Sequence, residues 1–180
     1  MVSNTIPKNS KPPKGYSIWL HGGGSDNLAF NETLKQLQQT CHSPEFIPHV
    51  TLLGQVENIP VKTLKAALGT LAAKYHRFDL LFNKVEVQDD YFRVCCLKVQ
   101  KNAFLSHLRE EMTAILKFKP DKAYKAHLSL VYGKNMKDLQ TARLQGAELV
   151  KEKFLVSQIS LIKTAGEVNR WTKECSCVFQ

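Results

Sequence analysis

Several features that define other classes of protein are missing from this 180-residue sequence. No apolar run approaches the roughly 20 residues that a helix needs to cross a bilayer. Residues 1–15 are rich in proline and lysine and lack the apolar core of a signal peptide. No repeat of short period is visible either. We therefore expect a flexible tail over residues 1–15, no membrane association and a cytoplasmic protein.

The cysteines lack the number and spacing of the common disulfide and zinc frameworks. The five cysteines are an odd number, and neither Cys95-Cys96 nor Cys175-x-Cys177 has the spacing of a zinc knuckle. Adjacent residues of a strand point to opposite faces, so Cys95 and Cys96 are poorly placed to share a bond. A chain of this length buries roughly 70% of its unfolded surface on folding, so it needs no disulfide or metal site to stabilise the fold. We expect reduced cysteines that pack as small core hydrophobes.

Acidic residues are fewer than basic ones: the sequence has 16 Asp and Glu and 25 Lys and Arg, which gives a net charge of +9 at pH 7. A positive field of this kind attracts anionic small molecules and polyanions, although a basic protein need not have a specific anionic partner. The glycine run at residues 22–24 has neither the G-x-x-x-x-G-K-S/T nor the G-x-G-x-x-G spacing of a phosphate loop. We interpret it as a connection between a strand and a helix.

Hydrophobic periodicity and turn residues predict an α+β protein with antiparallel pairing, because hairpins interrupt the alternation of strands and helices. The predicted helices cover residues 27–39 with Asp26 as N-cap, 61–75, 103–118 and 136–146. The predicted strands cover residues 16–20, 46–53 ended by Gly54, 78–87, 91–99, 126–132, 154–162 and 171–179.

Two tetrapeptides within these strands stand out. His49-Val50-Thr51-Leu52 and His127-Leu128-Ser129-Leu130 each place a hydroxyl two residues after a histidine. Residues i and i+2 of a strand share a face, so each motif presents an imidazole beside a hydroxyl. One such motif alone usually marks an ordinary core or surface histidine. Two copies in the same hydrophobic frame, one in each half of the chain, predict two related lobes that face each other across a cleft.

Two imidazoles with neighbouring hydroxyls can carry out acid–base chemistry on a phosphoester. The unperturbed pKa of histidine lies nearest neutrality, so one ring can accept a proton from water while the other donates one to a leaving oxygen. The hydroxyls of Thr51 and Ser129 can hydrogen-bond the phosphate oxygens as negative charge grows. No carboxylate or cysteine lies close in sequence to either motif, so we expect no metal and no cofactor. Surface or helix-end positions are expected for the other histidines, His21, His42, His76 and His107.

The paired motifs resemble those of the 2H phosphoesterase superfamily, most closely the plant and yeast cyclic phosphodiesterases. The resemblance spans residues 16–179 and rests on the frames at 46–51 and 126–132, the opening Tyr16-Ser17-Ile18-Trp19, and residues 161–164 followed by Trp171. It implies a bilobal fold in which two pseudo-symmetric antiparallel-sheet lobes with outer helices surround a central cleft. Residues 16–180 would form this single domain, and we expect a monomer.

The resemblance also implies an activity and the residues that perform it. Cyclic phosphodiesterases of this group hydrolyse ADP-ribose 1″,2″-cyclic phosphate, a by-product of tRNA splicing, to ADP-ribose 1″-phosphate. They also open nucleoside 2′,3′-cyclic phosphates to 2′-phosphates. By resemblance, His127 would activate the attacking water, His49 would protonate the leaving oxygen, and Thr51 and Ser129 would hold the phosphate. The motifs are nearly symmetric, so the two histidine roles can also be exchanged.

Three aromatic residues complete the candidate site, and the substrate range stays open. By resemblance Tyr132 would reach the phosphate and Trp19 and Phe92 would lie near the nucleotide base, although ordinary core packing would also account for each ring. Ala126 stands where relatives often have proline. One alternative is a 2′-5′ oligonucleotide phosphodiesterase or RNA-end-processing enzyme, for which RNA ends would be partners. Another is a non-catalytic basic module that binds RNA or nucleotides, against which the two intact His-x-Thr/Ser motifs argue.

Overall fold

The computed structural model describes residues 13–120, 123–133 and 139–180. The helices are α1 (Leu28–Thr40), α2 (Val61–Lys74), α3 (Ala103–Leu116) and α4 (Leu139–Leu149), with a 3-10 turn at Val168–Arg170. The strands are β1 (Tyr16–His21), β2 (Val50–Val56), β3 (Phe78–Leu80), β4 (Phe82–Val87), β5 (Cys95–Val99), β6 (His127–Val131), β7 (Phe154–Val156), β8 (Gln158–Lys163) and β9 (Thr172–Val178).

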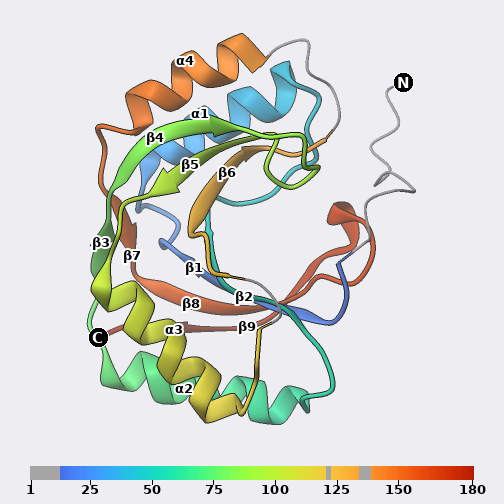
Figure 1. Ribbon diagram of the computed structural model, residues 1–180, viewed down its shortest axis with the longest axis vertical. Helices are drawn as coiled ribbons and strands as arrows, with labels where there is room; N and C mark the ends of the chain where they lie inside the picture. Colours follow the sequence, from blue (N-terminus) through green and yellow to red (C-terminus); the bar gives the residue numbers. More distant parts are fainter. Residues whose placement is uncertain (1–12, 121–122, 134–138) are drawn as a thin grey trace.

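One strongly curved sheet in the order β4-β5-β6-β2-β1-β8-β9 organises the molecule, and β3 pairs with β7 beside it. The strands β4, β5 and β6 form one lobe, which is covered by α1 and α4; β2, β1, β8 and β9 form the other, which is covered by α2 with α3 beside it (Figure 1). All ladders between described strands are antiparallel. The α+β class and the two-lobed antiparallel architecture predicted from the sequence are therefore confirmed.

The two lobes meet at β2 and β6, which share a single residue pair and then diverge. Divergence frees backbone carbonyls that would otherwise be paired in a ladder, and buried carbonyls need other partners. Side chains supply them: the Tyr124 hydroxyl donates to the Thr51 carbonyl at 3.1 Å, and Arg109 Nε donates to the Leu52 carbonyl at 3.2 Å. The sheet is thus held open at the point where both histidine motifs lie.

Side-chain alternation decides which residues of the first lobe reach the core. Val85, Leu97 and Leu130 face α4 at Gly146, where a Cβ would come within 2.8 Å of a Leu130 methyl group. Glycine at this position therefore lets α4 approach the sheet closely. The residues between these apolar positions point to the opposite, concave face of the sheet, and the motif residues His127 and Ser129 are among them.

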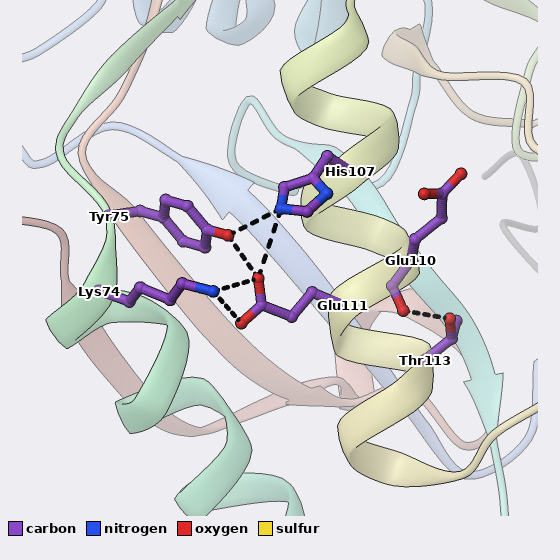
Figure 2. A network of polar contacts seen from close by, with 6 residues as sticks. All are labelled: Lys74, Tyr75, His107, Glu110, Glu111 and Thr113. Carbon is purple, nitrogen blue, oxygen red and sulfur yellow. Dashed lines mark hydrogen bonds and ion pairs between the residues drawn. The ribbon is translucent and has the colours of Figure 1, made fainter.

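A polar network joins the two outer helices of the second lobe (Figure 2). Lys74 Nζ donates to Glu111 Oε1 at 2.8 Å, and the Tyr75 hydroxyl donates to the same carboxylate. The Tyr75 hydroxyl also lies 3.1 Å from His107 Nε2. The exposed ion pair between Lys74 and Glu111 is worth little by itself, so we attribute to the network a role in fixing α2 against α3. His107 lies within α3 and its side chain is exposed, in agreement with the surface position expected from the sequence.

Some predicted strand limits are wrong. The strand expected at 46–53 begins at Val50, because Pro48 has no N–H to donate to a ladder, and it continues through Gly54 to Val56. The strand expected at 78–87 is interrupted at Leu81, because β3 and β4 pair with different partners. The strand expected at 91–99 is reduced to β5, since the residues before it form a turn.

Two local predictions near the glycine run are also wrong. Asn27, not Asp26, is the N-cap of α1, and its side chain makes no capping hydrogen bond. The Asp26 carboxylate instead accepts hydrogen bonds from the Gly23 amide at 2.7 Å and the Ser157 hydroxyl at 2.6 Å. His21, expected at the surface, is 4% exposed. Its Nε2 lies 2.7 Å from the buried Ser160 hydroxyl, so it is a hydrogen-bonded core histidine.

The remaining expectations concern the ends of elements and the cysteines. Of the predicted tail, residues 1–12 lie outside the described part of the chain, whereas the carbonyls of Pro13 and Gly15 accept hydrogen bonds from the amides of Gly166 and Thr164. Residues 136–138 of the fourth predicted helix also lie outside it. No disulfide joins the five cysteines, which all lie in the described ranges, and three of them are buried. None of the helices in the described ranges has the length and apolarity that a bilayer crossing requires.

Candidate active site

One pocket of about 260 Å³ between the lobes is lined by all seven residues selected from the sequence. Trp19 comes from β1, Thr51 from β2 and His49 from the position just before β2. His127 and Ser129 come from β6. The seven residues are Trp19, His49, Thr51, Phe92, His127, Ser129 and Tyr132.

The two imidazoles are oriented by the same local contact. His49 Nδ1 lies 2.7 Å from the carbonyl of Ile47, and His127 Nδ1 lies 2.8 Å from the carbonyl of Lys125. A carbonyl only accepts hydrogen bonds, so Nδ1 carries the proton in both rings and Nε2 is left for a substrate. The contact reaches back two residues in each case, across Pro48 in the first motif and Ala126 in the second.

The surroundings of His49 keep it neutral. Its side chain is 5% exposed, and its ring stacks on Trp19 with centroids 3.5 Å apart and planes 8° from parallel. Burial lowers the pKa of His49 to about 3, against the opposing effect of the Ile47 carbonyl. The nearby positive charge of His127, when protonated, lowers it further. At neutral pH the Nε2 atom of His49 is therefore unprotonated and can accept a hydrogen bond.

His127 is half-buried and lies beside a charged pair. Burial lowers the pKa of His127 and the Lys125 carbonyl raises it; Arg93 lowers it further, whereas Asp90 and Glu86 raise it. Arg93 donates to Asp90 at 2.6 Å. Burial raises the pKa of Asp90, but the hydrogen bonds from Arg93 and the Phe92 amide outweigh this effect, so the Asp90 carboxylate stays ionised. The net effect is a lowered pKa for His127, which the nearby Asp90 and Glu86 carboxylates oppose only in part.

The two hydroxyls have different environments. Ser129 is 5% exposed, and its hydroxyl donates to the Phe92 carbonyl at 2.7 Å. A phosphate contact from Ser129 therefore requires its hydroxyl to rotate. Thr51 is half-buried and lines both this pocket and a second one of about 260 Å³ on the side toward Tyr124. Thr51 is accordingly the more accessible of the two hydroxyls.

The aromatic residues pack against one another and together form one wall of the pocket. Trp19 covers one face of His49 and meets Trp171 edge-on, with centroids 5.8 Å apart. Phe92 lies over Trp171 at 5.8 Å with planes 25° apart, and both rings are half-buried. Tyr132 is 4% exposed and stacks on Phe46 at 3.8 Å. The half-buried Phe92 and Trp171 therefore offer more open surface to a nucleotide base than Trp19, whose exposure is only 5%.

Among the lining residues that the sequence did not identify as site residues, Asp90, Arg93 and Trp171 bear most on the chemistry of the pocket. Asp90 and Arg93 lie in the turn before β5, where Asp90 also accepts a hydrogen bond from the Phe92 amide at 3.0 Å. An Asp-x-x-Arg pair at the start of the strand predicted at 91–99 was the available signal. Trp171 lies some forty residues after β6 in the chain, and only the fold brings it to the pocket.

The chemistry available here is proton transfer and anion binding. Within the described residues, no group of three or more His, Cys, Asp or Glu side chains is arranged to hold a metal ion. The pocket instead combines two imidazoles, two hydroxyls and a guanidinium held by a carboxylate. Such a set can bind a phosphate group and move protons on either side of it.

Comparison with known proteins places the fold and the family. No protein with a curated description matches the chain. Among solved structures, TT0787 of Thermus thermophilus matches with a TM-score of 0.61 and 15% identity, over 92% of this chain and 97% of that one. E. coli LigT complexed with NADP+ matches with a TM-score of 0.55 and 14% identity, over 94% and 99%. E. coli LigT complexed with 3′-AMP matches with a TM-score of 0.52 and 15% identity, over 93% and 99%.

These structural likenesses establish a shared fold. The family described as "cyclic phosphodiesterase-like protein" matches residues 15–177, which covers nearly the whole chain and both histidine motifs. The chain belongs to the cyclic phosphodiesterase-like family, within the 2H phosphoesterase superfamily.

Proposed function

We propose that the protein hydrolyses cyclic phosphates, namely nucleoside 2′,3′-cyclic phosphates to 2′-phosphates and ADP-ribose 1″,2″-cyclic phosphate to ADP-ribose 1″-phosphate, without a metal ion. One observation carries the proposal. Two histidines, each oriented through Nδ1 by the carbonyl two residues earlier, line one pocket from opposite lobes beside two hydroxyls. The 3′-AMP bound to E. coli LigT, which has the same fold, is consistent with a nucleotide ligand.

The reaction needs one base and one acid. A water oxygen forms a bond to phosphorus as the base removes its proton, and the bond from phosphorus to O3′ breaks as the acid protonates that oxygen. Thr51, Arg93 and a rotated Ser129 would stabilise the negative charge on the nonbridging oxygens. Arg93 suits this task because its guanidinium carries a fixed charge and Asp90 fixes its position.

The different surroundings of the two rings support an assignment. His49 is the more deeply buried and is kept neutral, and a protonated His127 lowers the pKa of His49 further. Burial and Arg93 lower the pKa of His127 as well, but Asp90 and Glu86 oppose that shift, whereas no carboxylate opposes it at His49. We therefore assign His49 as the base and His127 as the acid, which exchanges the roles that resemblance alone implies.

The activity is tested with EDTA present, on cytidine 2′,3′-cyclic phosphate and on ADP-ribose 1″,2″-cyclic phosphate. Turnover of both that is lost in His49→Ala and in His127→Ala is the expected result, with a bell-shaped dependence of kcat/KM on pH. Lys62→Gln on α2, which lines none of the site pockets, serves as the control. Activity that disappears with EDTA, or that survives loss of either histidine, would refute the mechanism.

The assignment of roles has its own test. A cyclic nucleotide with sulfur in place of the bridging O3′ has a leaving group that needs no proton. We expect this substrate to restore activity to His127→Ala and not to His49→Ala, because a good leaving group replaces the acid but not the base. Rescue of His49→Ala alone would reverse the assignment.

A further inference from the structure

A basic groove starts at His127 and runs away from the pocket over β5 and β4. Its volume is about 970 Å³, and both His127 and Arg93 line it as well as the active-site pocket. One carboxylate, Glu86, lines the groove. Its basic side chains are Lys84, Arg93, Lys98, Lys101 and Lys125.

The register of the strands places two of these lysines in line with the catalytic imidazole. Lys98 on β5 is opposite His127 on β6, and Lys84 on β4 is opposite Lys98. Residues opposite each other in a ladder share a face, so the three side chains form a row across the concave face. Adjacent strands lie about 4.8 Å apart. The row therefore carries positive charge about 10 Å beyond His127, on the order of two strand spacings.

The row is electrostatically unfavourable when the groove is empty. Like charges directly opposite each other in a ladder destabilise a sheet, and Lys84 and Lys98 are so placed. Glu86 relieves part of this repulsion, with its Oε1 atom 2.9 Å from Lys84 Nζ and 3.8 Å from Lys98 Nζ. Both lysine side chains remain about half exposed, at 57% and 48%. A groove with this excess of cations and open access is suited to bind successive negative charges.

We propose that this groove binds the phosphodiester backbone of a single-stranded RNA whose 3′ end is a 2′,3′-cyclic phosphate. A mononucleoside 2′,3′-cyclic phosphate carries one negative charge, held between the two imidazoles, and nothing that reaches Lys84. A strand that continues from the terminal 5′ oxygen places further phosphates along the row. The sugar of the terminal nucleotide must be ribose, because a 2′,3′-cyclic phosphate requires a 2′ oxygen. The aromatic wall of Phe92 and Trp171 takes the terminal base on the other side of His127.

The inference rests on the proposed function for its catalytic readout, and a matched pair of double variants tests it. Lys84→Gln/Lys98→Gln removes the row, and Lys62→Gln/Lys65→Gln removes the same charge from exposed positions on α2. Each is assayed with cytidine 2′,3′-cyclic phosphate, with ADP-ribose 1″,2″-cyclic phosphate and with an RNA hexamer that ends in a 2′,3′-cyclic phosphate. The salt dependence of kcat/KM is measured for all three substrates.

Only the Lys84→Gln/Lys98→Gln protein should lose activity on the hexamer, on the order of tenfold at low salt. The slope of its log kcat/KM against log salt concentration should become shallower by about 1.4, or about 0.7 for each lost phosphate contact. Its kcat/KM for the mononucleotide should stay within about twofold of wild type. Equal behaviour of the two double variants on the hexamer would overturn the inference and leave the proposed function intact. A loss confined to ADP-ribose 1″,2″-cyclic phosphate would also overturn it, in favour of a pyrophosphate-bearing substrate.

Binding separates this inference from a failure of the proposed function. Fluorescence anisotropy with a labelled hexamer that ends in a 2′,3′-cyclic phosphate requires no turnover. If none of the cyclic phosphates is hydrolysed, weaker binding by the Lys84→Gln/Lys98→Gln protein alone would still support the groove. Equal affinity of wild type and both double variants would exclude it.

Discussion

The buried imidazole of His49 should make the stability of the folded protein depend on pH. Its pKa is lowered to about 3 by burial, whereas an unfolded chain returns it to about 6.5. The unfolded state therefore binds more protons between these two values. Stability is complete above pH 6.5 and is lost as the pH falls toward 3, because protonation of His49 is available only to the unfolded chain.

The size of the effect follows from the same two pKa values. Each pH unit within this window changes the free energy of unfolding by about 1.4 kcal/mol per group, so His49 alone should cost about 2 kcal/mol between pH 7 and pH 5. Burial also lowers the pKa of His21 and of His127, and both act in the same direction. The total loss in wild type should therefore exceed the part due to His49.

The assay is urea denaturation at pH 7 and pH 5, followed by the fluorescence of Trp19 and Trp171. His49→Asn removes the titrating group and keeps a side-chain N–H for the Ile47 carbonyl. Its loss of stability between the two pH values should be smaller than that of wild type by about 2 kcal/mol. Thr51→Val changes the same pocket without removing a titrating group and should keep the full dependence. An equal loss in wild type and His49→Asn would refute the reasoning.

Three further predictions address the surroundings of the site. Trp19→Phe keeps a ring against His49 and should retain activity within a few fold, whereas Trp19→Leu should lower kcat more than it changes KM, because the imidazole loses its orientation. Arg93→Gln should raise the pKa of His127, measured by NMR titration of the imidazole, since Arg93 now lowers it; an unchanged pKa would contradict this. Gly146→Val should destabilise the protein by about 1–3 kcal/mol in urea and leave kcat unaltered, because its side chain would clash with Leu130 and Val85.

The parts of the fold that the sequence predicts are those with strong local periodicity. The buried stripe of Leu64, Leu68 and Leu71 sets the helix at 61–74, and the structure ends it one residue before the predicted limit. Limits that depend on tertiary pairing were predicted less well. Nothing in the run 78–87 signals that its first residues pair with β7 and the rest with β5. Strand breaks of this kind are decided by partners far away in the sequence.

The candidate site shows the same division. The four motif residues were predictable because their chemistry repeats at a fixed two-residue spacing, and the fold brings them to one pocket. Asp90, Arg93 and Trp171 carry no such repeat. Their place in the site depends on a turn conformation and on the return of the chain after β8, neither of which periodicity describes. The catalytic roles of all these residues stay predictions until they are tested.

The near symmetry of the two motifs also limits what they can predict about mechanism. Both imidazoles are held by the carbonyl two residues earlier, so the motifs themselves give the two rings equal geometry. Any difference in role between the two imidazoles must then come from residues outside the motifs. Trp19 on β1 stacks on His49 and shields it from solvent, whereas the turn before β5 places Asp90 and Arg93 beside His127. Two rings with equal geometry can thus serve as base and acid because their lobes surround them differently, which is a property of the fold rather than of the motif.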